Sequence, residues 1–562
     1  MPKRTRSTTL HEGPITMANG KASDSPNILI ILNDDMGFSD IGCYGGEIQT
    51  PNLDRLATNG LRYSQFYNTA RCSPSRASLL TGLHPHQTGI GILTYSNGPE
   101  GYAGNLNKSC VTVAEVLKQN KYKTYLSGKW HISSSLTEPT DAWPLQRGFD
   151  YFFGTIIGAG SFYHPNTLTR GNDNIEHEAE SDPSFFYTDA ISDQAVAFIR
   201  QHKQANPNTP FFQYVAYTAP HWPLHAHDED VAKYKGRFDA GWDKLREQRL
   251  RRLVDDGIIH PNWQLTDRDP TQPPWTEAEH REWTLRCMEV YAAQIDRMDQ
   301  GIGRIVAALE ETGHLDNTLL IFLSDNGACA EDIPQGVTAR ELVDQLMIAK
   351  ANTRKGKPVR LGNDPSLMPG GEDTYQSYGT AWANLSNTPF RLYKHWIHEG
   401  GIATPFIVHW PRGIKEKGGL RHNPSQLPDI MATIVDVTGA TYPREYNGNT
   451  ILPCEGESLV PSFASAYGGR GPLFWEHEGN AAVRIGKWKL VRKYPGSWEL
   501  YDMETDRTEM HDLAAQHPDR VRDMTQQYQA WAKRCGVIPR EKILELMKAE
   551  GGTAFWEEEK QK

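Results

Sequence analysis

The sequence predicts an α/β protein with a large, mostly parallel central sheet flanked by helices, followed by a smaller C-terminal α+β domain that contains an antiparallel sheet. Short, continuous apolar runs at 27–33 (NILIILN) and 318–324 (TLLIFLS) suit strands that are buried on both faces. Helical segments alternate with such runs, which is typical of βαβ units. Beyond residue 472, alternating apolar and polar residues at 480–492 and 498–502 indicate antiparallel strands instead.

The remaining elements follow from the same patterns. We expect helices at 112–120, 190–202, 427–438 and 517–534, and strands at 122–127, 210–217 and 404–410. Thr276 and Glu279 fit a capping box, which predicts the start of a long amphipathic helix that ends at Gly313. The polar segment 331–378 is either a substrate-facing lid or a surface insertion. The expected domains are a flexible tail (1–26), a main domain (27–455) and a C-terminal subdomain (456–562).

Composition excludes several classes of protein. The chain has 562 residues and a formal net charge of −10 without a basic stripe, so nucleic acid is not an expected partner. We find no apolar run long enough for a membrane-spanning helix, and no membrane association is expected. The polar N-terminus lacks the apolar core of a secretory signal, and the seven cysteines form no CxxC pair. We therefore expect a cytoplasmic, globular, enzyme-like protein.

Charged and polar residues follow four of the predicted strands. In an open parallel sheet, ligands bind beyond the carboxyl ends of the strands. These positions hold Asp34 and Asp35 after 27–33, Lys129 and His131 after 122–127, His221 after 210–217, and Asp325 and Asn326 after 318–324. Taken singly, such residues are common where strands turn. Taken together, they predict one crevice in which these side chains converge.

The oxygen-bearing members of this set indicate a metal site. Asp34, Asp35, Asp325 and Asn326 offer only carboxylate and amide oxygens. Hard divalent cations such as Ca²⁺ and Mg²⁺ prefer these ligands, whereas zinc prefers histidine and cysteine. Three carboxylates at a buried site also require a cation, because unpaired buried charges are costly. We therefore favour a metal site over simple turn residues.

Residues 72–76 (CSPSR) predict the start of a short helix. Ser73 suits the N-cap, Pro74 suits the first helical position and Gly82 suits the C-terminal cap. Cys72 would then lie just before a helix N-terminus, where peptide dipoles favour anions. Arg76 in the first turn could hold an anion as well. Cys72 is accordingly either a nucleophilic thiol with a lowered pKa or a buried structural cysteine.

Cys72-Ser73-Pro74-Ser75-Arg76, continued through Leu80-Thr81-Gly82, resembles the signature of the type I sulfatases, C-x-P-x-R-x-x-x-L-T-G. Further blocks agree in kind and order: NDDMG at 33–37, GKWH at 128–131, APHWPL at 219–224, SDNG at 324–327, and TPFRLYKHWIHEGG at 388–401, which contains Lys394. The likeness is closest to bacterial arylsulfatases. One departure is Ile132-Ser133 after His131, where the family often has Leu-Gly; it concerns loop shape more than chemistry.

The resemblance implies a fold of the alkaline-phosphatase superfamily and hydrolysis of sulfate esters. In that family a maturation enzyme oxidises the signature cysteine, here Cys72, to formylglycine, an aldehyde. One hydroxyl of its hydrate attacks sulfur, and loss of the proton from the other then expels sulfate. The resemblance further implies Ca²⁺, in preference to Mg²⁺, held by Asp34, Asp35, Asp325 and Asn326.

The family pattern also implies roles for the remaining site residues. Arg76 and Lys129 stabilise the hydrate, and His131 takes the proton of its second hydroxyl. His221 and Lys394 contact the sulfate and the leaving oxygen, and the sequence does not decide which of the two is the acid.

The natural substrate is left open by the sequence. A small aryl or alkyl sulfate is our first expectation, and a sulfated carbohydrate is the alternative. Aromatic and histidine side chains either line the substrate mouth or belong to the core, namely Trp222, Trp130, Tyr163, His164, His225 and His227. Two other functions compete: a phosphate or phosphonate ester hydrolase that uses the same formylglycine, and a non-catalytic anion-binding protein with an unmodified Cys72.

Overall fold

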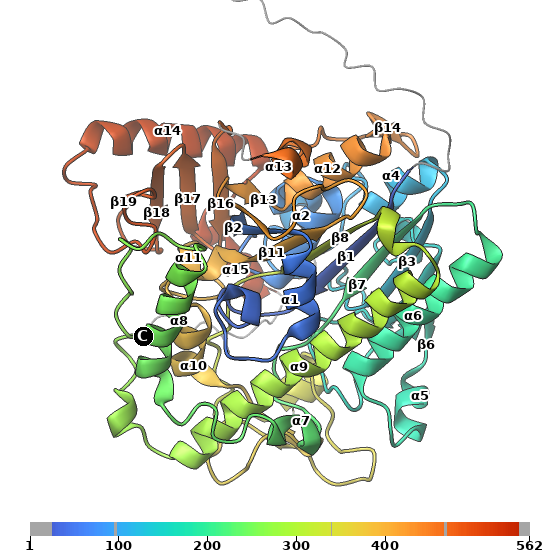
Figure 1. Ribbon diagram of the computed structural model, residues 1–562, viewed down its shortest axis with the longest axis horizontal. Coiled ribbons are helices and arrows are strands. Elements are labelled where there is room, and N and C mark those ends of the chain that lie inside the picture. Colours follow the sequence, from blue (N-terminus) through green and yellow to red (C-terminus); the bar gives the residue numbers. More distant parts are fainter. Residues whose placement is uncertain (1–24, 95–97, 339, 466–468, 550–562) are drawn as a thin grey trace, which may run out of the picture.

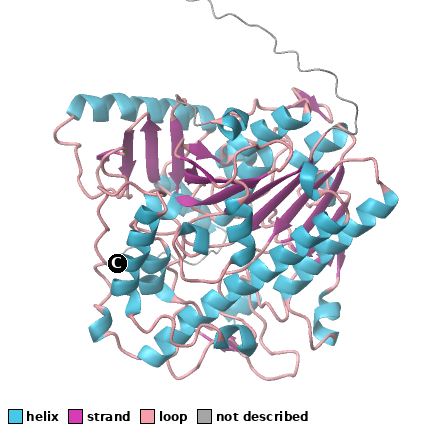
Figure 2. Ribbon diagram, in the orientation of Figure 1, coloured by secondary structure: helices cyan, strands magenta, loops and turns pink. Residues whose placement is uncertain are grey.

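The computed structural model describes residues 25–94, 98–338, 340–465 and 469–549. Within these residues, eleven strands form one central sheet and four form a separate C-terminal sheet, with helices on both sides of the central sheet (Figures 1 and 2). The predicted fold class is confirmed. The predicted tail, residues 1–26, lies almost entirely outside the described residues, and the predicted domain boundaries stay predictions.

Four adjacent parallel strands form the centre of the large sheet. Their order is β8 (Thr318–Ser324), β1 (Asn27–Asn33), β7 (Phe211–Ala216) and β3 (Lys123–Gly128). The register pairs Asn33 with Ser324 and Gly128 with Ala216, so the strands end at the same level. Every residue of β1, β7 and β8 is buried, as expected for strands covered on both faces.

The outer strands are mixed in direction. They are β2 (Leu61–Tyr67), β4 (Tyr151–Thr155), β5 (Leu168–Arg170), β6 (Asp173–Asn174), β11 (Ala403–His409), β12 (Gly419–Arg421) and β13 (Ser425–Gln426). Strand β11 lies between β8 and β2 and runs antiparallel to both. Strand β4 continues the parallel order beyond β3. The predicted strand 404–410 therefore exists, but it is not part of the parallel core.

Helices cover the two faces of the sheet and form two cores. One core contains α1 (Pro51–Thr58), α6 (Tyr187–Ala205) and the long α9 (Arg281–Glu311), which cross the sheet side by side in Figure 1. The other contains α2 (Cys72–Thr81), α4 (Val113–Gln119) and α12 (Pro428–Thr438). Alternate residues of β1 enter each core, Leu29 the first and Ile30 the second. Among the described residues, no helix combines the length and apolar character needed to cross a membrane.

Shorter elements lie around this framework. They are α3 (Pro85–Thr88), α5 (Glu176–Ser181), α7 (Asp228–Ala232), α8 (Gly241–Asp255), α10 (Gly379–Ser386), α11 (Glu399–Ile402), α13 (Val460–Ala464), and the small pairs β9 (Arg360–Leu361) with β10 (Thr374–Tyr375) and β14 (Glu445–Tyr446) with β15 (Asn449–Thr450). The polar insertion 331–378 thus holds little regular structure.

The C-terminal sheet is antiparallel, as predicted from the alternating residues. It consists of β16 (Leu473–His477), β17 (Asn480–Ile485), β18 (Trp488–Arg492) and β19 (Glu499–Asp502), and α14 (Pro518–Cys535) covers it, while α15 (Arg540–Ala549) follows (Figure 1). Trp531 and Tyr528 of α14 pack on Leu490 in a small core of their own. Strand β16 contacts the main domain, because the indole of its Trp475 donates to the carbonyl oxygen of Asn68 at 3.0 Å.

Two predicted helix starts are wrong. Thr276 lies in a short 3-10 turn and α9 begins at Arg281, because Trp275 packs against Trp242 and its backbone N–H is held by Asp243. Ser73 is not the N-cap of α2: the extended Arg71 is, and Cys72 is already helical. Pro74 is tolerated two residues later because N–H groups of the first turn have no helical partner.

Candidate active site

The ends of β1 and β8 bring the four predicted metal ligands together. The backbone N–H of Asp35 donates to Asp325 Oδ1 at 3.2 Å, and the Asn326 amide donates to Asp35 Oδ1 at 2.5 Å. Asp34 lies directly at the end of β1, and each of the four residues is at most 1% exposed. Since β1 and β8 are parallel neighbours in register, Asp34 and Asp35 meet Asp325 and Asn326 at one point of the sheet edge.

Three buried cations surround these carboxylates. Arg76 Nη2 lies 2.8 Å from Asp325 Oδ2 and 3.5 Å from Asp34 Oδ2. Lys129, at the end of β3, donates to Asp34 Oδ2. Lys394 Nζ lies 2.9 Å from Asp35 Oδ2, although it is hundreds of residues away in sequence. Residues predicted from five separate segments therefore form one charged crevice.

The donor set of this crevice fits a hard divalent cation. Asp34 Oδ1 and Asn326 Oδ1 are buried and have no hydrogen-bond partner among the described residues. Burial and the neighbouring charge of Asp34 raise the pKa of Asp325 to about 7. A bound cation would relieve this repulsion, and the two free oxygens would coordinate it. Oxygen ligands of this kind suit Ca²⁺ or Mg²⁺.

Two histidines with lowered pKa values lie beside the carboxylates. His221 Nε2 is 3.3 Å from both Asp35 Oδ2 and Lys394 Nζ, while its Nδ1–H donates to the carbonyl oxygen of Trp222 at 2.6 Å. Burial lowers the pKa of His221 to about 3 despite the nearby Asp35 carboxylate. Burial and the charges of Lys129 and Arg76 lower the pKa of His131 well below its usual value. A neutral imidazole can accept a proton, as a general base must.

Gly158, which the sequence analysis did not single out, leaves room for the ring of His131. His131 has a left-handed backbone, with φ of 56°. A Cβ atom on Gly158 would lie 2.1 Å from His131 Cε1. Only glycine leaves room for this ring, and no local sequence pattern indicates that.

Cys72 is the first residue of α2 and is 3% exposed. Arg76 and Lys394 both lie within electrostatic range of its side chain. The helix N-terminus adds the positive end of its dipole at the same place. Cys72 therefore lies where an anion is stabilised, next to the crevice.

Two further charged residues, also missed by the sequence reasoning, form the rim. Arg71 Nη1 and Glu331 Oε1 make an ion pair of 2.6 Å, and Glu331 Oε2 lies 3.9 Å from Lys394 Nζ. The indole of Trp222 donates to Glu331 at 3.3 Å. The first residue of the polar insertion thus faces the crevice. Arg71 could have been suspected from its position before Cys72, but nothing in the sequence links Glu331 to it.

The six predicted mouth residues separate into different groups. Trp222 lies against His221, with ring centroids 4.3 Å apart. Trp130 belongs to the core, the second of the two alternatives: it is fully buried and donates to the carbonyl oxygen of Ala142. His164 and His225 line a small pocket with Lys350 and Glu372. Tyr163 and His227 pack on one another and on Phe186.

Two protein-family models match this chain. The family model described as Sulfatase matches residues 26–440. This chain belongs to the sulfatase family. A second model, N-sulphoglucosamine sulphohydrolase, C-terminal, matches residues 390–533. The match includes the whole crevice, so the chain is a sulfuric ester hydrolase, a type I sulfatase of the alkaline-phosphatase-like superfamily.

Individual relatives are similar over most of their length. The chain is 33% identical to an arylsulfatase of Klebsiella aerogenes, over 81% of this chain and 95% of that protein. It is 31% identical to an uncharacterized sulfatase of Schizosaccharomyces pombe, over 93% and 96% of the two chains. The structure of BT4656 in complex with its substrate D-glucosamine-2-N,6-O-disulfate is similar in fold, with a TM-score of 0.59, 21% identity, and coverage of 92% of this chain and 100% of that one.

Proposed function

We propose that this sulfatase hydrolyses small aryl or alkyl sulfates with a formylglycine at position 72 and a Ca²⁺ ion held by Asp34, Asp35, Asp325 and Asn326. The observation that carries the proposal is the convergence of these oxygens with Arg76, Lys129 and Lys394 beside the first turn of α2. The likeness to the arylsulfatase of Klebsiella aerogenes supports the choice of substrate class.

The two groups would supply distinct chemistry. Ca²⁺ would neutralise charge on sulfate oxygens, and the hydrated aldehyde would supply one hydroxyl for attack on sulfur and a second for release of sulfate. The protein's own side chains would position the nucleophile and stabilise negative charge. Arg76 and Lys129, both fully buried, hold the nucleophile and disperse negative charge in a site that is organised beforehand.

The two proton transfers are assigned to different residues. His131 is half-buried and its lowered pKa keeps it neutral, so we assign it the proton of the second hydroxyl. His221 carries its proton on Nδ1, which donates to Trp222, and its Nε2 receives the hydrogen bond of Lys394. Lys394 is therefore the group with a proton facing the crevice. We assign to Lys394 the protonation of the leaving oxygen, with His221 orienting it.

A substrate panel tests the proposal. Turnover of 4-nitrophenyl sulfate, an alkyl sulfate and a sulfated monosaccharide is compared with that of 4-nitrophenyl phosphate and a phosphonate ester, with Cys72→Ser as control. We expect turnover to be highest on the small sulfates and lowest on the phosphorus esters. Preference for a phosphorus ester, or for the sulfated sugar, would contradict the proposed substrate class.

Mass spectrometry of the peptide spanning residues 71–76 tests the nucleophile. After expression with a formylglycine-generating enzyme, we expect the mass of the aldehyde at position 72. An unmodified thiol in fully active protein would refute the proposed nucleophile. An unmodified thiol in protein that binds sulfate without turnover would instead indicate an anion-binding protein.

A further inference from the structure

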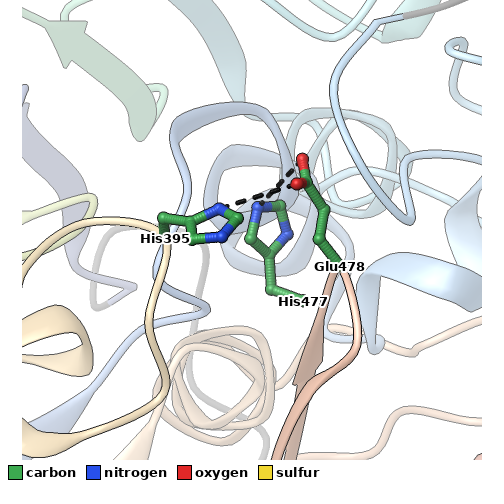
Figure 3. Close-up of side chains that lie close together, drawn as sticks. All are labelled: His395, His477 and Glu478. Carbon is green, nitrogen blue, oxygen red and sulfur yellow. Dashed lines mark ion pairs between the residues drawn. The ribbon is translucent and has the colours of Figure 1, made fainter. Parts of the chain in front are cut away.

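A buried cluster of two histidines and a glutamate lies next to Lys394. His395 follows Lys394 in the chain, His477 ends strand β16, and Glu478 begins the β16–β17 turn of the C-terminal sheet. Figure 3 shows both imidazole rings turned towards the Glu478 carboxylate, with His395 Nδ1 3.7 Å and His477 Nε2 3.6 Å from its oxygens. The three side chains are 7%, 0% and 4% exposed, in the order His395, His477, Glu478.

The cluster has the composition of a metal site, but its hydrogen bonds oppose that interpretation. The Asn480 side chain is fixed by its neighbours: Oδ1 accepts from the Tyr494 N–H at 3.1 Å, and Nδ2 donates to the His477 carbonyl oxygen at 3.1 Å. The same Nδ2 lies 3.3 Å from His395 Nε2, which must therefore accept. The His395 proton is then on Nδ1, facing Glu478, where a metal would need a lone pair.

Charge opposes a metal ion as well. Arg540 Nη1 lies 3.0 Å from Glu478 Oε2, so a cation already neutralises the carboxylate. Glu478 also lies within electrostatic range of Arg71. A second, divalent cation would add repulsion without a matching anion. The cluster is best described as a glutamate carboxylate that is paired with one guanidinium and faced by one imidazole N–H at 3.7 Å.

The segment that carries Lys394 and His395 contacts two other segments of the main domain. The backbone N–H of His395 donates to the carbonyl oxygen of Ala70 at 2.7 Å, two residues before Cys72. On the other side, the Lys394 N–H donates to the Ala328 carbonyl oxygen at 3.0 Å. The segments with Lys394 and with Cys72 therefore meet at His395, whose ring faces Glu478.

Unusual backbone conformations mark all three segments. Ala70, His395 and Glu478 have φ values of 63°, 90° and 51°, in the left-handed region that non-glycine residues seldom adopt. Such conformations persist only where surrounding contacts enforce them. At this junction the contacts come from Glu478, Asn480 and the backbone bond between His395 and Ala70.

We propose that Glu478 is a positioning residue for catalysis: paired with Arg540, it holds His395 and so fixes the backbone that aims Lys394 at the leaving oxygen. This inference rests on the function proposed above, since it assigns Lys394 to that oxygen. It also gives the C-terminal subdomain a part in the reaction, although none of its residues touches the metal ligands in the contacts described above.

Leaving-group dependence distinguishes positioning from simple destabilisation. Poor leaving groups, such as the alcohol of an alkyl sulfate, depend on protonation by Lys394, whereas nitrophenolate leaves with little help. Glu478→Ala should therefore lower kcat/KM for the alkyl sulfate about tenfold more than for 4-nitrophenyl sulfate. Glu478→Gln, which keeps an acceptor for the His395 N–H, should restore part of the difference. Loss of folded protein would lower both rates by the same factor.

Glu476, on strand β16 two residues before Glu478, provides a matched control. It is 5% exposed and has a histidine partner of its own, His86, at 2.7 Å, and it accepts the Gly479 N–H at 2.6 Å. Glu476→Ala should destabilise the turn without changing the ratio of the two rates. Equal ratios in wild type and both Glu478 variants would overturn the inference. Stoichiometric zinc in the purified protein that is lost in Glu478→Ala would overturn it as well.

Binding of inorganic sulfate, measured by calorimetry, keeps the two proposals separate. If the wild type turns over no sulfate ester, the proposed function fails, and the comparison is made on sulfate affinity instead. Weaker sulfate binding by Glu478→Ala than by Glu476→Ala would still support the positioning of Lys394. Equal affinities would overturn it.

Discussion

Two buried regions of this sulfatase are rich in charge, and they differ in how the charges are matched. The first is the crevice around Asp34, Asp35 and Asp325. The second, here called the interface cluster, joins the main domain to the C-terminal sheet and consists of Glu399, Lys489, Arg507 and Glu509. Lys489 Nζ lies 2.8 Å from Glu399 and 2.8 Å from Glu509, and Arg507 Nε lies 2.7 Å from Glu399.

The carboxyl pKa values report the difference. In the interface cluster, Lys489 and Arg507 outweigh the effect of burial and lower the pKa of Glu399 to about 2. In the crevice, burial and the adjacent Asp34 raise the pKa of Asp325 to about 7, whereas Lys394 and His221 outweigh burial at Asp35 and lower its pKa to about 2. The same residue types therefore serve stability where each carboxylate faces only cations, and ligand binding where two carboxylates also face one another.

The largest expected effect is that of Asp325→Ala. The variant removes one proposed metal ligand and the partner of Arg76, so turnover should fall by about three orders of magnitude. Steady-state rates and calcium content by elemental analysis give the measurement. Asp299→Asn is the control, since Asp299 is an equally buried aspartate that binds Asn52 and Leu53 at a distance from the crevice. Full activity in Asp325→Ala would refute the metal assignment.

Glu399→Gln tests the other region. Breaking a buried ion pair from one side should lower the free energy of unfolding by about 3 kcal/mol. The folded pKa of about 2 lies below the ordinary value of 4.5, so the carboxylate stabilises the fold above pH 4.5 and loses that effect as the pH falls towards 2. Denaturant unfolding should show a difference between variant and wild type that shrinks over this range. A constant difference would contradict the charge-based explanation.

The sequence could predict the crevice because its elements are local patterns. The residues of β1 and β8 are apolar throughout, and the acidic residues follow at once, so the strand ends and their contents can be read together. Parallel pairing then places those ends at one edge. Lys394 was found only through the family resemblance, since it follows no predicted strand.

Other parts of the site depend on tertiary contacts that leave no local pattern. Glu331 begins a polar insertion, and Glu478 follows an antiparallel strand of the C-terminal sheet. Each approaches the site through packing between segments that are far apart in sequence. The start of α9 was mispredicted for the same reason, because Trp275 is held by Trp242 from another helix.

Gly158→Ala tests the shape of the crevice alone, because it leaves every charge in place. The new Cβ would lie 2.1 Å from His131 Cε1, so the ring must move away from its proton-accepting position. We expect kcat to fall about ten- to hundredfold. Gly160→Ala is the control, since a Cβ there has its nearest neighbours at 3.7 Å. Equal rates for both variants would show that the position of His131 does not limit turnover.

The smallest expected effect is that of Glu331→Gln at the rim of the crevice. Glu331 Oε2 is 3.9 Å from Lys394 Nζ, so its charge opposes the approach of an anionic ester and of the sulfate product. Because the carboxylate is partly solvated and paired with Arg71, neutralising it should lower the inhibition constant for sulfate only about threefold. Glu372→Gln, which breaks the Arg354 pair on the same insertion, should leave that constant unchanged. Weaker sulfate inhibition in Glu331→Gln would mean that Glu331 acts mainly by holding Arg71 in place for the anion. The Glu331–Arg71 ion pair would then have a structural role, like the ion pairs of the interface cluster.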